Sequence, residues 1–311
     1  MITLTSPFAQ PWHFFALEWL IIGCFLMTAV HAWGRYRRGD RYPAFQWLVI
    51  VAYGLSMELI AFHYWQNYAH AQFSVQLHND LLPLYISALY PVFYYVGLKT
   101  VDHHGLPWWK EASIAGLAIC LLDVPFDTIG VPAGWWVWGA PAEAAVQEIH
   151  LEAVKTRWLD VPVTSYLWYL VFGAILTAVL RGVRSRMEHR SLGVYFLAAL
   201  PVALVIIVLG VLAFNPLFWG PRAVGIPDDV IVAGVMLLGI GLAWRSPRGA
   251  PDWIGRVTLS VQGFMIGVLL YTWKTTEQPD ARLAAMVAAV AISAMLRRPR
   301  TSTSSLAEQA A

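Results

Sequence analysis

Charged side chains are scarce in this sequence of 311 residues: Asp, Glu, Lys and Arg make up 13% of it, against ~25% in water-soluble domains. Hydrophobic residues make up 58%, and apolar runs of nearly twenty residues recur along the chain. Runs of this length can cross a bilayer as helices. The scarcity of charge therefore excludes a water-soluble globular domain. The formal net charge of +2 does not favour binding to nucleic acid.

Cysteine is rare, and the two that occur, Cys24 and Cys120, lie inside apolar runs. A thiol packs there like a small hydrophobic group, so we predict neither a disulfide nor a cysteine-based metal site. Nine histidines are present, but no His-x-x-x-His, His-Glu-x-x-His or Glu-x-x-His spacing brings two ligands to one helix face. We therefore predict no bound metal.

Motifs for nucleotide and cofactor chemistry are missing as well. The chain has no P-loop, no dinucleotide-binding glycine pattern and no G-x-S-x-G nucleophile motif. His31 and His63 fall near opposite faces of the membrane, so they cannot ligate one haem. Lys274 lies at the edge of a predicted span, which does not suit a retinal pigment. These absences exclude ATP-driven pumping by this chain alone, and we predict no cofactor.

The apolar segments predict an all-α fold, a polytopic transmembrane helical bundle formed by residues 1–298 as one domain. For residues 299–311, which are mostly small and polar, we predict a disordered cytoplasmic tail. The nine predicted spans are at about 14–33, 44–65, 81–98, 112–131, 161–180, 192–214, 229–244, 257–273 and 281–296.

Basic residues predict the orientation of the bundle. With the N-terminus outside, sixteen Lys and Arg residues fall on the cytoplasmic side and five on the other, which agrees with the positive-inside rule. This arrangement also puts the C-terminus in the cytoplasm. Arg is far more frequent than Lys, as is typical of GC-rich bacterial genomes. We therefore predict a multi-pass protein of the bacterial inner membrane.

Carboxylates gather in the outer halves of three predicted spans. The stretch "LLDVPFDTIG" carries Asp123 and Asp127, whose spacing of four puts both on one helix face. Pro125 between them predicts a kink or an end of the helix. Glu18 and Glu58 lie in the first and second spans. A charge at the bilayer centre costs about 2.5–3.5 kcal/mol, so we expect these acids to meet in one partly hydrated pocket.

Such a pocket suits acid–base chemistry. A desolvated carboxyl group can protonate an alkene, while a second carboxylate stabilises the cation or activates water. Aromatic faces can stabilise a carbocation. The alternative is structural: acids that join helices, and tryptophans that form an interfacial belt. The candidate catalytic residues are Asp123, Asp127, Glu58 and His63. The candidate substrate-binding residues are Glu18, Trp135, Trp136, Trp138, Tyr166, Asn67 and His70.

The segment from Glu58 to Gly173 resembles the integral-membrane carotenoid hydratases of bacteria and archaea. The similarity lies in "LLPLYISALYPVFYYVG", in the Asp-bearing span that leads to "GWWVWGAP", and in "WLDVPVTSYLWYLVFG". The early "T-G-x-P-F-G-x-Y" pattern of that family is replaced here by "HYWQNYAHAQF". The resemblance implies addition of water to a terminal isoprenoid double bond. By position, it places Glu58, Asp123, Asp127, Trp136, Trp138 and Pro162 on the family's motifs.

Three functions remain open from the sequence. The first is a membrane enzyme that acts on an isoprenoid or other long lipid, in contact with membrane lipids and without nucleic acid. The second is a proton-coupled transporter that uses the same carboxylates as a relay. The third is an accessory membrane protein without chemistry. The inner halves of the spans carry few ionisable residues, which favours the enzyme. The oligomeric state is left open.

Overall fold

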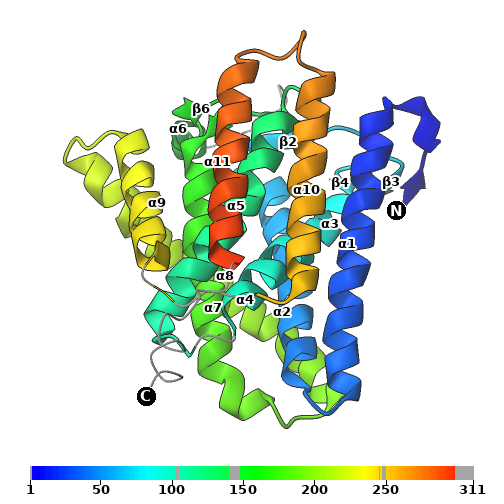
Figure 1. Cartoon of the computed structure of the whole chain (residues 1–311), viewed down its shortest axis with the longest axis vertical. Helices are drawn as coiled ribbons and strands as arrows, with labels where there is room; N and C mark the ends of the chain where they lie inside the picture. The colour runs from blue at the N-terminus through cyan, green and yellow to red at the C-terminus, as the bar shows by residue number, and fades with distance from the viewer. Residues whose placement is uncertain (1, 103–104, 140–147, 245, 247–249, 298–311) are drawn as a thin grey trace, which may run out of the picture.

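The protein is a bundle of long helices, seen in a computed structural model that describes residues 2–102, 105–139, 148–244, 246 and 250–297 (Figure 1). The predicted tail, 299–311, lies outside these residues. The helices are α1 (Trp12–Arg37), α2 (Tyr42–Ile60), α3 (Leu84–Tyr90), α4 (Val96–Val101), α5 (Trp108–Gly130), α6 (Glu148–Ala153), α7 (Val163–Met187), α8 (Leu192–Ala223), α9 (Asp228–Trp244), α10 (Asp252–Tyr271) and α11 (Pro279–Arg297).

Three short helices of other types complete the set: η1 (Pro7–Ala9) and the π-helices η2 (Ala61–Trp65) and η3 (Pro91–Tyr95). η2 extends α2, and η3 joins α3 to α4. A π-helix accommodates one extra residue per turn and often occurs at functional sites. Both lie at positions where the sequence alone predicts a continuous regular helix.

Seven helices in the described part of the chain are long and apolar enough to cross a membrane, as expected of a multi-pass membrane protein. All nine predicted spans are helical in the structure. The count of nine crossings is not confirmed, for two reasons. The predicted span at 81–98 is divided into α3, η3 and α4, and α9 has 17 residues.

Helix α5 lies at the centre of the bundle and packs against α4, α7, α9, α10 and α11 (Figure 1). A helix that is apolar on every side is buried on every side. Its approach to α7 is closest at two glycines: a Cβ on Gly116 would meet the carbonyl of Leu170, and one on Gly173 would lie 2.9 Å from the Cα of Gly116. Small residues of this kind let membrane helices pack closely.

Pro125 does not end α5, which continues as a regular helix to Gly130. A proline in a helix removes the bond to the carbonyl four residues before it, here that of Leu121. The side chain of Gln262 in α10 replaces this bond, because its Nε2 donates to the Leu121 oxygen at 2.9 Å. The predicted helix end was therefore wrong, since a neighbouring helix satisfies the freed carbonyl.

Short strands cover one end of the bundle. They are β1 (Thr3–Leu4), β2 (Tyr68–His70), β3 (Val75–Leu77), β4 (Leu82–Pro83), β5 (Trp136–Trp138), β6 (Arg157–Trp158) and β7 (Val161–Pro162). The sheets are β1-β3-β4, β2-β5 and β6-β7, and all pairs are antiparallel. The turns after α1 and α7 lie at the opposite end (Figure 1).

Candidate functional site

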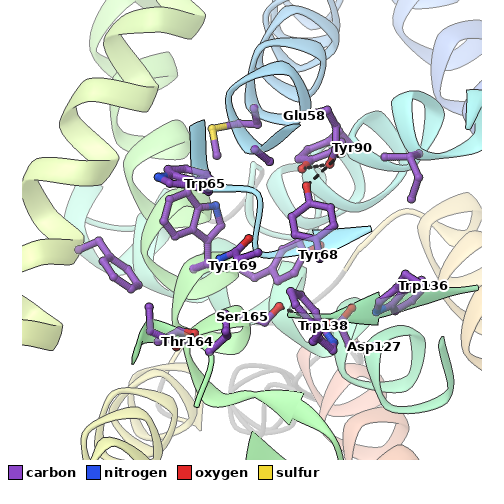
Figure 2. A pocket seen from close by; sticks show the side chains of 18 of the residues that line it. Glu58, Trp65, Tyr68, Tyr90, Asp127, Trp136, Trp138, Thr164, Ser165 and Tyr169 are labelled. Carbon is purple, nitrogen blue, oxygen red and sulfur yellow. Dashed lines mark hydrogen bonds between the residues drawn. The ribbon is translucent and has the colours of Figure 1, made fainter. Parts of the chain in front are cut away.

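A cavity of about 450 Å³ lies beneath the strand-covered end of the bundle, and we call it the aromatic cavity (Figure 2). Its wall is formed by α2, η2, β2, α3, η3, α5, β5, α6, α7 and α8, and includes several aromatic rings. The volume is within the range of small-molecule sites. The polar residues of its wall include Glu58, Asn67, Tyr68, His70, Tyr90 and Asp127.

Glu58 is a buried carboxylate with two phenol donors. Tyr90 donates its hydroxyl to Oε1 at 2.7 Å, and Tyr68 donates to Oε2 at 3.1 Å. Nε2 of His70 lies 3.6 Å from the same Oε2. Burial, and then the charge of Glu58, raise the pKa of Tyr68 well above its ordinary value, so this phenol stays a neutral donor. Glu58 thus has one phenol donor on each of its carboxylate oxygens.

Asp127 projects into the aromatic cavity from α5, facing α7. Its Oδ2 accepts a hydrogen bond from Ser165 at 2.7 Å. Asp123 lies one turn earlier and is fully buried behind the wall, with Asp127 and Tyr169 as polar neighbours. Neither of its carboxylate oxygens makes a hydrogen bond of good geometry within the described residues. The spacing of four thus brings the two aspartates together, but Asp127 alone of the pair lines the cavity.

The pairing of β2 with β5 forms one wall. His70 lies opposite Trp136, and Tyr68 lies opposite Trp138. Alternation along a strand puts residues two apart on the same side, which turns these four side chains toward one another. Gly130, the last residue of α5, allows this arrangement because a Cβ there would overlap the Trp136 ring.

Besides Asp123, four more of the predicted site residues lie outside the cavity wall. Nε2 of His63 is 2.8 Å from Nε2 of the His78 ring, and His63 is exposed. His63 contacts His78, whereas Glu58 contacts Tyr68 and Tyr90, so the two side chains do not share a partner. Glu18 is buried but accepts from Ser74 and from the amide of Val75 at 3.2 Å.

The other two are aromatic. Trp135 donates its indole N–H to Nδ1 of His13 at 3.1 Å and points away from the cavity, since neighbouring residues of an extended segment face opposite sides. Tyr166 is buried with its hydroxyl 3.5 Å from Oγ1 of Thr128. The wall does include the predicted Glu58, Asp127, Asn67, His70, Trp136 and Trp138.

Several residues of the wall were not anticipated from the sequence, namely Tyr68, Tyr90, Ser165 and Asn215. Asn215 had a visible signal, because an Asn-Pro pair interrupts the apolar run "VLAFNPLFW". Tyr90 had none, since nothing local connects a tyrosine of α3 with a glutamate of α2. No group of three His, Cys, Asp or Glu side chains in the described ranges is placed to hold a metal ion.

Comparison with known proteins gives a family and no function. No curated protein and no solved structure matches the chain. The family model described as "Domain of unknown function (DUF7802)" matches residues 6–240, which is more than half of the chain and contains the whole aromatic cavity. This protein therefore belongs to the DUF7802 family.

Proposed function

We propose that this protein is a membrane-embedded enzyme that acts on an isoprenoid or other long lipid by carboxylate acid–base chemistry. The supporting observation is that Glu58 of α2 and Asp127 of α5 line one aromatic cavity. Acidic side chains inside a membrane are energetically costly, so they are rare, usually have partners and often mark functional sites. We further propose the inner membrane of a bacterium as its location, with the cavity in the periplasmic leaflet.

The two carboxyl groups have different surroundings, which suits different roles. Each carboxylate oxygen of Glu58 accepts a hydrogen bond from a phenol, Oε1 from Tyr90 and Oε2 from Tyr68. Asp127 lies one helical turn from the fully buried Asp123, and two buried carboxyl groups this close cannot both ionise at low cost. In this proposal Asp127 is the acid and Glu58 is the charged partner.

The form of the reaction that fits these roles is hydration of a carbon–carbon double bond, as the resemblance to carotenoid hydratases implies. Asp127 transfers its proton to one alkene carbon, and the neighbouring carbon becomes a cation. The faces of Trp136 and Trp138 and the charge of Glu58 stabilise this cation. Water adds to it and loses a proton to a carboxylate, which leaves an alcohol and restores the proton inventory of the site.

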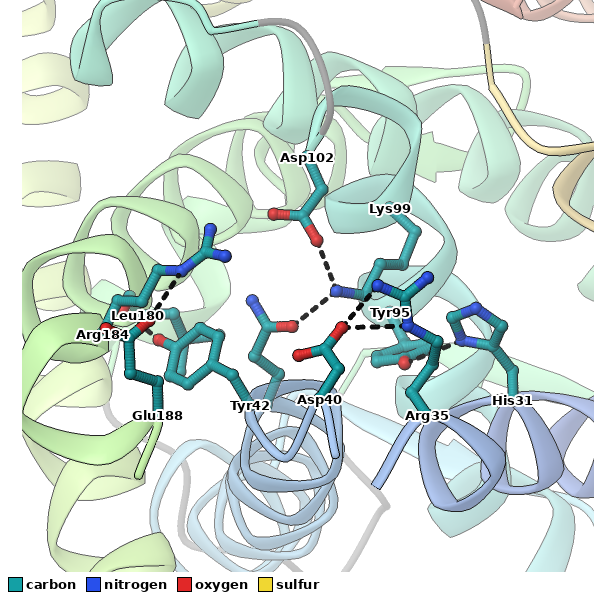
Figure 3. A network of polar contacts seen from close by, with 11 residues as sticks. His31, Arg35, Asp40, Tyr42, Tyr95, Lys99, Asp102, Leu180, Arg184 and Glu188 are labelled. Carbon is teal, nitrogen blue, oxygen red and sulfur yellow. Dashed lines mark hydrogen bonds and ion pairs between the residues drawn. The ribbon is translucent and has the colours of Figure 1, made fainter. Parts of the chain in front are cut away.

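A proton-coupled carrier is the second candidate. The contacts at the end of the bundle opposite the strands, near the turns after α1 and α7, do not favour it. Two ion pairs lie there (Figure 3). Nζ of Lys99 lies 2.5 Å from Oδ2 of Asp102 and donates to Gln46 at 2.6 Å, while Nε of Arg35 donates to Asp40 at 2.9 Å. Groups that already hold fixed partners stabilise helix ends, whereas a relay needs groups that exchange partners.

The test is extraction of lipids and pigments from cells that express the native chain, Asp127→Asn or Glu18→Gln at equal protein levels. The proposal expects Asp127→Asn to abolish the product and to accumulate its unsaturated precursor. Glu18→Gln is the matched control, because Glu18 is a buried acid outside the cavity. An unchanged lipid profile for Asp127→Asn would refute the enzyme, and proton flux into vesicles would then support the carrier.

A further inference from the structure

The wall of the aromatic cavity is polar on one side and apolar on the other. Figure 2 shows Glu58, Tyr90 and Tyr68 together on one side and Trp65 across from them. The apolar side continues into α8 through Val211, Phe214 and Trp219. A ligand that matches this wall has an apolar part against α8 and a polar part near Glu58.

Several buried polar atoms of the wall make no hydrogen bond within the described residues, although Nε2 of His70 lies 3.6 Å from Oε2 of Glu58. They are both ring nitrogens of His70, the indole N–H groups of Trp136 and Trp138, and Oδ1 of Asn67. Trp136 is 3% exposed, and the His70 side chain is 7% exposed. Buried polar groups nearly always have a hydrogen-bond partner, so a cluster of exceptions indicates a bound group. Indole N–H groups can only donate, so the matching group is an oxygen acceptor.

The cavity reaches the lipid-facing surface between η2 and α8. Tyr64 of η2 is 59% exposed, and Asn215 of α8 is exposed as well, yet both line the cavity. The residues that flank Asn215 on the surface of α8 are apolar, with Leu212 62% exposed and Leu217 45% exposed. Polar side chains on membrane helices face a cavity or a partner, and Asn215 marks such an opening.

We infer that the aromatic cavity binds the oxygen-bearing end of an amphiphilic lipid, whose oxygen meets His70 and the indoles and whose apolar chain leaves between η2 and α8 into the bilayer. This inference rests on the proposed function, which puts the substrate in the aromatic cavity, and adds the chemical class of that substrate. It names the substrate class as a lipid with a hydroxyl or carbonyl oxygen. A pure hydrocarbon would leave the donors of the wall unpaired.

The test uses the full chain in lipid nanodiscs and two probes: the isoprenoid alcohol geranylgeraniol, and the hydrocarbon of the same chain with hydrogen in place of the hydroxyl group. Binding is measured from the rise in unfolding temperature with the mole fraction of each probe. We expect the alcohol to bind at least about tenfold more tightly, because a site built for an oxygen rejects an analogue that lacks it. Equal affinity for the two probes, or no binding of either, overturns the inference.

Two substitutions distinguish binding of the alcohol in the aromatic cavity from nonspecific partition of the probes into the bilayer. Trp138→Phe keeps the aromatic ring and removes the N–H, so we expect it to reduce the advantage of the alcohol severalfold. Trp33→Phe, at an exposed tryptophan on α1, should leave that advantage unchanged. If Trp138→Phe still binds the alcohol as much more tightly than the hydrocarbon as the native protein does, the inference that the oxygen meets the indole N–H groups is overturned.

A second pair of variants tests whether the apolar chain of the lipid leaves the cavity between η2 and α8. Asn215→Trp fills the opening and should weaken both probes about tenfold, while Leu212→Trp, on the exposed surface of α8, should weaken neither. Equal probe affinities of the native protein and Asn215→Trp would overturn the proposed exit of the lipid chain between η2 and α8. Each of these readouts is binding without turnover. The lipid-extraction experiment can therefore fail while the binding site stands, and the reverse also holds.

Discussion

Pro125 removes one backbone hydrogen bond from the centre of α5, and Gln262 replaces it from α10. Gln262 is fully buried, and its Nε2 donates to the Leu121 carbonyl at 2.9 Å and to Oγ of Ser293 at 3.0 Å. Gln262→Leu keeps a similar volume but leaves the Leu121 carbonyl without a donor. An orphaned buried acceptor costs about 1–3 kcal/mol, so we expect the free energy of unfolding to fall by that amount.

A second substitution isolates the cause. Pro125→Ala restores a backbone N–H that can bond the Leu121 carbonyl directly, as in a regular helix. In this background Gln262→Leu should cost about 1–2 kcal/mol less than in the native chain, because the carbonyl keeps a donor. The contribution of the bond to Ser293 is the same in both backgrounds, so it cancels in the double-mutant cycle.

The assay is reversible unfolding of the four variants in mixed detergent micelles, followed by circular dichroism. Equal costs of Gln262→Leu in the two backgrounds would refute the reasoning, since the carbonyl would then not be the reason for the effect. The result bears on the site as well, because Asp123 and Asp127 flank Pro125 on the same helix.

Three further predictions concern the strand-covered end of the bundle. Arg282→Met should lower the free energy of unfolding by about 1–3 kcal/mol, because the buried carbonyl of Thr128 loses its guanidinium donor; thermal unfolding with the exposed Lys274→Met as control checks it. Gly130→Ala should lower the free energy of unfolding by about 1–3 kcal/mol and abolish probe binding, because the new methyl group displaces the ring of Trp136. The control Gly23→Ala, at a helix position with open space around it, should leave the free energy of unfolding unchanged or raise it, and should leave probe binding unchanged. Lys and Arg partners lower the pKa of Glu152, so its link between α6 and α8 is present at neutral pH and lost as the pH falls through that lowered value. The hydrogen-exchange protection factors of α6, corrected for the intrinsic exchange rate at each pH, should fall on acidification in the native chain and not in Glu152→Gln.

Each of these has an outcome that contradicts it. A loss below about 1 kcal/mol for Arg282→Met would mean that the carbonyl finds another donor. Unimpaired binding by Gly130→Ala would mean that the tryptophan ring moves without changing the cavity. Protection factors of α6 that fall equally in Glu152→Gln would assign the pH dependence to another group.

The helices and the class of protein follow from the sequence, because they depend on local properties. Length and apolarity define a membrane helix, and all nine apolar segments are helical in the structure. The spacing of Asp123 and Asp127 sufficed to bring them together, since four residues is one turn of one helix. Local pattern also marked Trp136 and Trp138 as residues of the site.

The aromatic cavity itself depends on tertiary structure, because its wall comes from segments far apart in the chain. Which acid faces it was decided by how the helices pack: Asp127 faces it, Asp123 lies behind it, and Glu18 is held by the β3 segment instead. The phenol donors of Glu58 come from β2 and α3, and no spacing in the sequence connects them. The continuity of α5 past Pro125 required a side chain from α10, which a local pattern cannot contain.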